Sequence, residues 1–207
     1  MRDRVPRMSD VDHDLLYDLA QSQAGYFTAG QAGEAGMDRS TLRYHARPGG
    51  RFERIGRGVY RLRHFPTTPH EHVVAAWLPL RHAGAVISHA SALELYELSD
   101  GIADAVHVSI ARSKRGQRPR TGVQIHTLTR PLEPHEIRDT AGARATSPER
   151  TLVDCLEDGT QPEQVELAIR QALNRGLTTS RRLREAAVTQ SSRTRKLVND
   201  AVPQVRE

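Results

Sequence analysis

Arginine recurs through residues 38–63 at a spacing that is suited to binding a nucleic acid. The stretch holds eight arginines and two acidic residues. Arg39, Arg43 and Arg47 are four residues apart, so a helix would place them on one face together with Ser40 and Tyr44. Such a face can reach base edges in the major groove of duplex DNA. The chemistry that this pattern predicts first is therefore recognition of DNA.

A two-stranded wing is predicted directly after that helix. Pro48-Gly49-Gly50 forms a turn, and residues 51–55 and 59–62 alternate large and charged side chains around Gly56-Arg57-Gly58. Arginines on such a hairpin would contact phosphates, whereas the helix would contact bases. The residues predicted to contact DNA are Arg39, Ser40, Arg43, Tyr44, Arg47, Arg51, Arg54 and Arg57.

The residues before the basic helix complete the pattern of a winged helix-turn-helix. Residues 10–23 have apolar side chains at helical spacing, with an N-cap at Ser9 or Asp10. Tyr26-Phe27 predicts a short strand, and Thr28 predicts the N-cap of a second, short helix. The alternative is a winged helix that is used only for contacts with proteins.

Charge and composition narrow the class of partner. The formal net charge of +5 and the sequence pI near 9.9 favour a polyanionic partner and salt-dependent binding. Aromatic residues make up 4 % of the 207 residues, which disfavours proteins that stack single-stranded bases on aromatic platforms. Duplex DNA is therefore favoured over RNA.

Cysteine usage and hydropathy predict a cytoplasmic protein. The single cysteine, Cys155, excludes an internal disulfide and a zinc site built from several cysteines. Residues 1–10 lack the apolar core of a secretory signal, and no apolar run is long enough to span a bilayer. Met8 is an alternative start, because Ser9-Asp10 already opens the first helix.

The rest of the chain predicts a second domain that mixes helices and strands, which makes the fold class α+β. Residues 64–69 mark a boundary, so we expect a winged-helix domain at 1–65, an α+β domain at 66–190 and a polar tail at 191–207. The polar C-terminal stretch is either a frayed helix or an unstructured tail. Strands are predicted at 85–87, 105–111 and 122–128, and helices at 70–80, after Ser88-His89, from Ser147, at 162–174 and at 180–188.

A basic loop lies between the last two predicted strands. It contains no acidic residue, and its five basic residues are Arg112, Lys114, Arg115, Arg118 and Arg120. The loop is either a solvated hairpin tip or a second contact for phosphate or for an acidic partner.

Two segments of the second domain, in order behind the wing, carry a resemblance to a known family. Residues 87–93 read ISHASAL and residues 145–156 read ATSPERTLVDCL. Together with the wing at 52–60, they make the chain resemble the AbiEi-family antitoxins of bacterial type IV toxin–antitoxin operons, the actinobacterial MenA-like members most closely. The resemblance covers residues from about 10 to 188.

The resemblance implies a function for each domain. The N-terminal domain would bind inverted repeats in the promoter of its own operon and repress it. The C-terminal domain would neutralise a neighbouring nucleotidyltransferase-like toxin of the AbiEii or MenT kind.

Enzymatic chemistry is the alternative that the resemblance leaves open. The chain has no GxxxxGK[ST] or GxGxxG loop and no protein-kinase signature. If the antitoxin modified its toxin, as an atypical serine kinase using ATP and Mg²⁺, the candidate residues would be His89, Glu149, Arg150 and Asp154. The structural alternative, which we favour, is that Ser147 caps a helix, that Arg150 pairs with Asp154, and that His89 and Ser91 stabilise a helix start.

Three histidines are candidate metal ligands. His89, His107 and His126 would approach one another if the predicted strands pair. Histidines on a polar sheet face are more often hydrogen-bonded residues than ligands, so we expect no bound metal and no cofactor. The open hypotheses are thus an autorepressor that is also an antitoxin, an enzyme that modifies the toxin, and an adaptor that docks an acidic toxin surface.

Overall fold

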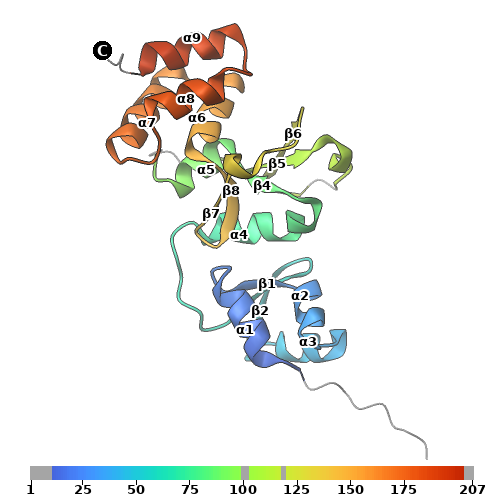
Figure 1. Ribbon diagram of the computed structural model, residues 1–207. Coiled ribbons are helices and arrows are strands. Elements are labelled where there is room, and N and C mark those ends of the chain that lie inside the picture. Colours follow the sequence, from blue (N-terminus) through green and yellow to red (C-terminus); the bar gives the residue numbers. More distant parts are fainter. Residues whose placement is uncertain (1–10, 99–102, 118–119, 203–207) are drawn as a thin grey trace, which may run out of the picture. The chain divides into compact units, whose positions relative to one another are not determined.

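The computed structural model describes residues 11–98, 103–117 and 120–202 and divides into two compact units, Met1–Pro79 and Leu80–Glu207 (Figure 1). Each unit combines helices with one sheet, which agrees with the predicted α+β class. Within the first unit, an ion pair between Arg61 and Glu71 links the helix that follows the sheet to the sheet itself.

The N-terminal unit builds a three-stranded antiparallel sheet with strand order β1-β3-β2. Its elements are α1 (His13–Gln21), β1 (Tyr26–Thr28), α2 (Ala29–Glu34), α3 (Arg39–His45), β2 (Phe52–Gly56), β3 (Val59–Leu62) and α4 (Glu71–Trp77). The predicted hairpin is confirmed: β2 and β3 pair antiparallel, with an irregular register between Arg54 and Gly56.

Local hydrogen bonds explain where these helices begin. Thr28 caps α2 as predicted and forms a capping box with Gln31. Asp38 caps α3 by accepting from the backbone N–H of Thr41 at 2.7 Å. The cap of α1 is Asp12, which accepts from Leu15 N at 2.9 Å; the predicted caps Ser9 and Asp10 lie outside the described residues. The core between these helices and the sheet contains the buried residues Leu16, Phe27, Met37, Leu42 and Phe52.

The C-terminal unit contains a five-stranded mixed sheet with strand order β6-β5-β4-β8-β7. Its strands are β4 (Val86–Ile87), β5 (Val106–Ala111), β6 (Val123–Leu128), β7 (Ile137–Thr140) and β8 (Ala143–Thr146). Its α-helices are α5 (His89–Leu95), α6 (Pro148–Glu157), α7 (Pro162–Asn174), α8 (Ser180–Ala187) and α9 (Ser192–Ala201). Short 3₁₀ turns lie at Leu78–Ala83, Arg112–Lys114 and Pro134–Glu136.

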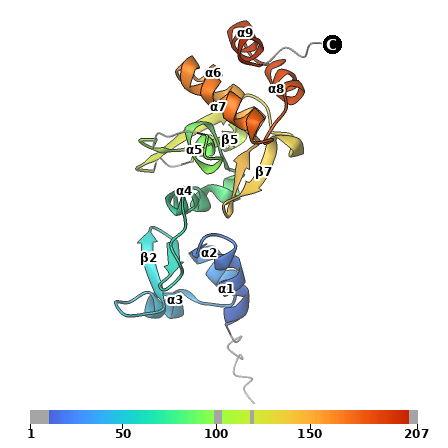
Figure 2. The same ribbon diagram turned by 90° about the vertical axis from the view of Figure 1, so that its left-hand side faces the viewer.

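Helix α6 forms the centre of the second hydrophobic core. It contacts α5, α7, α8 and α9, and both views show α6 to α9 gathered beside the sheet (Figures 1 and 2). Ser147 caps α6, Pro148 occupies its first turn, and Leu152 and Cys155 are fully buried on it. The predicted start of this helix is thereby confirmed.

One expectation for this unit is corrected, and one open alternative is decided. Strands β5 and β6 do pair, but they run parallel, with Val106 opposite Val123, so the basic loop is a return connection and not a hairpin tip. Residues 192–201 of the predicted polar tail form α9, because Val198 and Thr194 are buried and Ser191 caps the helix. None of the described helices combines the length and the apolar character that crossing a membrane requires.

Candidate functional site

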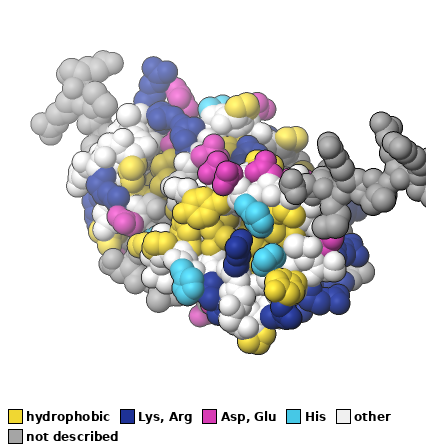
Figure 3. Space-filling view, turned by 90° about the horizontal axis from the view of Figure 1, so that it is seen from below, with side chains coloured by type: hydrophobic (Ala, Val, Ile, Leu, Met, Phe, Trp, Pro, Cys, Tyr) yellow, Lys and Arg dark blue, Asp and Glu magenta, His cyan; other side chains and the backbone are white. Residues whose placement is uncertain are grey.

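The basic residues predicted to contact DNA are all exposed on the N-terminal unit. Arg39, Ser40, Arg43 and Tyr44 lie on α3, and Arg47, Arg51, Arg54 and Arg57 lie in the following turn and on the β2–β3 hairpin. Within the described part of the chain, Arg39, Arg43, Arg51, Arg54 and Arg57 form no ion pair. Figure 3 shows Lys and Arg side chains beside His and hydrophobic side chains on one face of the molecule. These cations are available to a ligand.

Helix α3 is shorter than the arginine spacing predicts. It ends at His45 with Ala46 as its C-cap, since the residue before Pro48 disfavours helical backbone. Arg47 therefore lies beyond the helix, where its guanidinium packs over the ring of Tyr44 at 3.8 Å from the centroid. Its Nε also donates to the Tyr44 carbonyl at 3.1 Å. Arg39 and Arg43 remain one turn apart on the helix.

Two further arginines of this segment support the fold. The Nη2 atom of Arg61 donates to Glu71 and to the carbonyls of Phe65 and Pro66, and the side chain is buried. Arg63 pairs with Glu53 at 3.3 Å. Both arginines pair with carboxylates of the same unit, and Arg61 also donates to backbone carbonyls, so neither belongs to the exposed basic face.

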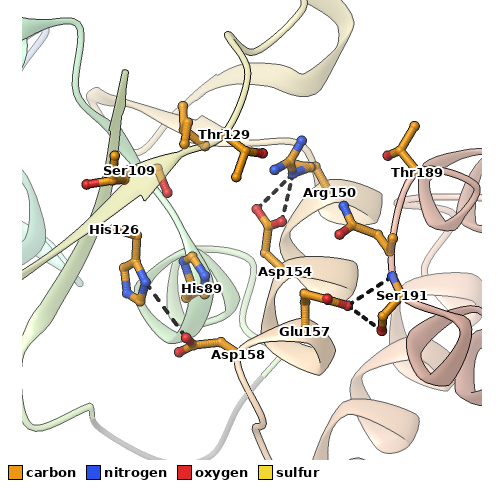
Figure 4. A pocket seen from close by; sticks show the side chains of 13 residues that line it. His89, Ser109, His126, Thr129, Arg150, Asp154, Glu157, Asp158, Thr189 and Ser191 are labelled. Carbon is orange, nitrogen blue, oxygen red and sulfur yellow. Dashed lines mark hydrogen bonds and ion pairs between the residues drawn. The ribbon is translucent and has the colours of Figure 1, made fainter. Parts of the chain in front are cut away.

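The C-terminal unit contains a pocket of about 420 Å³. Figure 4 shows its walls: histidines from α5 and β6 at one side, the N-terminal end of α9 at the other, and α6 between them. The residues that line it are His89, Ser109, His126, Thr127, Leu128, Thr129, Arg150, Asp154, Glu157, Asp158, Thr189, Gln190 and Ser191.

The structure brings three of the four catalytic candidates to this pocket. His89, Arg150 and Asp154 line it, whereas Glu149 is absent from its lining. Glu149 is buried and pairs through Oε1 with Arg182 at 3.2 Å. Glu149 thus has a partner on α8 and does not complete a carboxylate pair with Asp154.

Arg150 lies in a buried network of charges. Its Nε lies 2.8 Å from both carboxylate oxygens of Asp154, and its Nη1 donates to Glu136 at 2.9 Å. Arg130 forms two further hydrogen bonds with Glu136, each at 2.7 Å. Burial raises the pKa of Glu136, but hydrogen bonds from Arg130 and Arg150 outweigh burial and lower that pKa to about 2. With two carboxylate partners, Arg150 is positioned as a structural cation as well as a pocket wall.

The three histidines considered above converge at the other end of the pocket. Nδ1 of His107 lies 3.0 Å from Nε2 of His126, and the rings of His89 and His126 stack with centroids 3.7 Å apart. Nδ1 of His126 lies 4.0 Å from Asp158 Oδ1. Burial lowers the pKa of all three histidines, to about 4 for His89 and His126, so the rings are neutral at pH 7.

Serines hold this histidine cluster in place. Ser88 Oγ lies 2.9 Å from Nδ1 of His89 and accepts from Ser109 Oγ at 2.8 Å. Ser91 Oγ accepts from the backbone N–H of His107 at 2.9 Å, so its role is to support β5 and not to start α5. Sequence reasoning did not single out Glu136 or Asp158. Glu136 contacts Arg150, 14 positions away, and Asp158 faces His126, 32 positions away, and no local pattern links either pair.

The basic loop presents its charges to solvent. Arg112, Lys114, Arg115 and Arg120 are exposed, and Arg118 lies outside the described residues. Arg115 donates to the carbonyl of Arg112 at 3.5 Å. The loop is therefore a cationic surface of the C-terminal unit.

Comparison with known proteins identifies the N-terminal segment first. Residues 14–63 match the model of a family described as "Transcriptional regulator, AbiEi antitoxin". The predicted resemblance to AbiEi antitoxins is thus confirmed over these residues. No curated protein matches the sequence.

A solved structure shares the fold of the chain. The protein RV2827C from Mycobacterium tuberculosis, known from a crystal structure, is 13 % identical with a TM-score of 0.55, and the match covers 97 % of this chain and 78 % of that one. At this identity the likeness concerns the fold alone.

Proposed function

We propose that this chain is an antitoxin that binds the promoter of its own operon as a winged helix-turn-helix and represses transcription. The observation that supports this proposal is that the family match and the exposed arginines lie in the same segment. The segment matched by the AbiEi regulator family, residues 14–63, contains the whole exposed basic face of α3 and the β2–β3 hairpin.

The N-terminal unit has the parts that a winged helix needs. Helices α1, α2 and α3 precede the hairpin, and β1 pairs with β3 to complete a small sheet. In this assignment Arg39, Ser40 and Arg43 face the base edges, and Tyr44 with Arg47 lies at the end of that face. Arg51, Arg54 and Arg57 contact phosphates on either side of the groove.

Binding of the full chain to its own upstream DNA tests the proposal. Fluorescence anisotropy would compare that duplex with a scrambled duplex at several salt concentrations. We expect Arg43→Ala to weaken promoter binding by about tenfold and to reduce the difference in affinity between the upstream duplex and the scrambled duplex. Arg57→Ala should weaken both equally and reduce the salt slope by about 0.9.

A control separates specific contacts from net charge. Arg181→Ala removes one cation whose side chain is 85 % exposed on α8, in the other unit. It should leave promoter binding unchanged. Promoter affinity that is untouched by both Arg43→Ala and Arg57→Ala at moderate salt would contradict the DNA-binding proposal.

The antitoxin part of the proposal concerns the C-terminal unit. We assign to it the neutralisation of a nucleotidyltransferase-like toxin of the AbiEii or MenT kind, in a type IV system. The exposed cations Arg112, Lys114, Arg115 and Arg120 favour docking on an acidic toxin surface as one route. The second route is modification of a toxin serine with ATP and Mg²⁺, for which Arg150 and Asp154 line a pocket.

The intact mass of the toxin distinguishes the two routes. The toxin would be incubated with this protein, ATP and Mg²⁺, beside a sample without ATP. We expect an unchanged mass, because Arg150 and Asp154 already satisfy each other and Glu149 lies outside the pocket lining. If the toxin mass increased by one phosphate, and the Asp154→Asn variant no longer caused this increase, the enzymatic route would be supported and docking would be rejected.

A further inference from the structure

The histidine cluster of the C-terminal unit has the composition of a metal site. His89 comes from the start of α5, His107 from β5 and His126 from β6. One ring nitrogen of each lies within 4.8 Å of the corresponding nitrogen of the other two. We infer that these three residues bind one divalent transition-metal ion of the zinc class. The sequence alone favoured the other interpretation, in which the histidines are only hydrogen-bonded.

The spacing of the ring nitrogens fits such an ion. Zinc–nitrogen bonds of about 2.0–2.1 Å in tetrahedral geometry place two ligand nitrogens roughly 3.3 Å apart. The His107 and His126 nitrogens, at 3.0 Å, are already close to this separation. In the absence of metal a proton lies between them, and the ion would replace that proton. All three nitrogens lie within 4.8 Å of one another, but the His89 ring stacks on that of His126, so His89 must turn about χ2, a torsion with a broad minimum, to point its nitrogen at a shared ion.

The second ring nitrogen of His89 has a hydrogen-bond partner, and that of His126 faces a carboxylate that lies just beyond hydrogen-bond distance. Ligand histidines usually direct their other nitrogen to a carboxylate, a carbonyl or another polar group, which fixes the ring orientation. Nδ1 of His126 faces Asp158 at 4.0 Å, while its Nε2 faces His107. Nδ1 of His89 is occupied by Ser88, which leaves Nε2 for the ion.

The backbone at His89 adopts a conformation that is uncommon for a residue other than glycine. His89 has a φ of 52°, in the left-handed region that favours glycine. Residues other than glycine that are held in this region cluster at binding sites, where surrounding contacts enforce the conformation. The ring of His89, the first residue of α5, stacks on that of His126.

The donor set selects the class of metal. Three neutral imidazoles suit Zn²⁺, Co²⁺, Ni²⁺ or Cu²⁺, whereas Mg²⁺ and Ca²⁺ prefer oxygen ligands. His89 and His126 also line the pocket, so an ion held by the cluster would border it. The site is thus of the three-histidine type that leaves one position for water or an oxyanion. The inference does not depend on DNA binding, so the failure of either leaves the other standing.

Titration of the full chain with metal tests the site. After treatment with a chelator and dialysis, the protein would be titrated with ZnSO₄ by calorimetry and with CoCl₂ by visible absorption. We expect one ion per chain with an affinity in the micromolar range or tighter, and a tetrahedral Co²⁺ spectrum. His126→Gln and His107→Gln should abolish binding, and Asp158→Asn should weaken it by about 10- to 100-fold.

A matched variant controls for the other histidines of the chain. His135→Gln replaces an exposed histidine of the same unit and should leave the stoichiometry and the affinity unchanged. Circular dichroism of the metal-free variants shows whether they fold. If His126→Gln does not fold, imidazole ¹⁵N shifts of the wild-type chain on addition of Zn²⁺ replace it, and His89, His107 and His126 should shift together. A wild-type chain that binds no ion, or binding that survives His126→Gln, would overturn the inference.

Discussion

Arg61 Nη2 lies 3.1 Å from Glu71 Oε2, and this ion pair ties strand β3 to helix α4 within the N-terminal unit. Only 8 % of the Arg61 side chain is exposed, and the same Nη2 donates to two backbone carbonyls. Arg57, at the tip of the same hairpin, is exposed and unpaired within the described residues. Burial and pairing therefore divide neighbouring arginines into those that hold the unit together and those that are available to a ligand.

This division predicts opposite effects of two substitutions. Arg61→Met leaves Glu71 and two carbonyls without their donor, so we expect the unfolding free energy to fall by about 3 kcal/mol. Arg57→Ala should change it by less than about 0.5 kcal/mol while it weakens DNA binding. Urea unfolding followed by far-UV circular dichroism measures both. Equal stability of the two variants would show that the ion pair does not support the unit.

Tyr44 is expected to act on DNA binding through Arg47. The ring holds the guanidinium at 3.8 Å, and an exposed cation–π contact is worth about 0.5–1 kcal/mol. Tyr44→Ala should therefore weaken promoter binding by about two- to fivefold, whereas Tyr44→Phe, which keeps the ring, should not. The anisotropy titration described for Arg43 applies here. If Phe weakens binding as much as Ala, the hydroxyl contacts DNA directly.

The buried charge network predicts an acid-sensitive C-terminal unit. The folded-state pKa of Glu136 is about 2, below the ordinary value of 4.5, because Arg130 and Arg150 outweigh its burial. A carboxyl with a lowered folded-state pKa stabilises the fold above its ordinary pKa, and this stability is lost as the pH falls from about 4.5 to 2. Glu136→Gln should destabilise the protein at pH 7 by about 3 kcal/mol and should flatten the decline below pH 5.

Hydrogen exchange of the α6 amides localises that effect to the C-terminal unit. Glu166→Gln is the matched control, because its carboxylate pairs with Arg170 on the surface of α7 and is 47 % exposed. It should change stability by less than about 0.5 kcal/mol. A pH profile of Glu136→Gln parallel to that of the wild-type chain would mean that Glu136 is not ionised in the network.

Local patterns predicted the elements well, because their causes lie within a few residues. Ser147 followed by Pro148 marks the start of α6, and the alternation at 105–111 marks β5, since caps and side-chain periodicity act at short range. The same holds for the exposure of the arginines on α3. The end of α3 before Arg47 depends on Pro48, which the regular spacing of arginines conceals.

The pocket was harder to predict from the sequence, because its contacts join residues that are far apart along the chain. Asp158 approaches His126 across 32 positions, and Glu136 reaches Arg150 across 14. The parallel pairing of β5 and β6 sets Ser109 opposite His126, and a slip of one residue would turn His126 to the other face of the sheet. Strand direction was the missing information, and alternation alone does not encode it.

The buried thiol of Cys155, at the centre of α6, can report how often the surrounding helical core opens. Cys155 is fully buried, and burial raises the pKa of its thiol to about 12, so the native state offers neither access nor thiolate to an alkylating reagent. Modification then proceeds only through molecules in which the helices around α6 have separated. The rate of alkylation, read with the natural sequence and no added label, therefore reports how often this helical core opens and how far a toxin, a metal ion or DNA slows that opening.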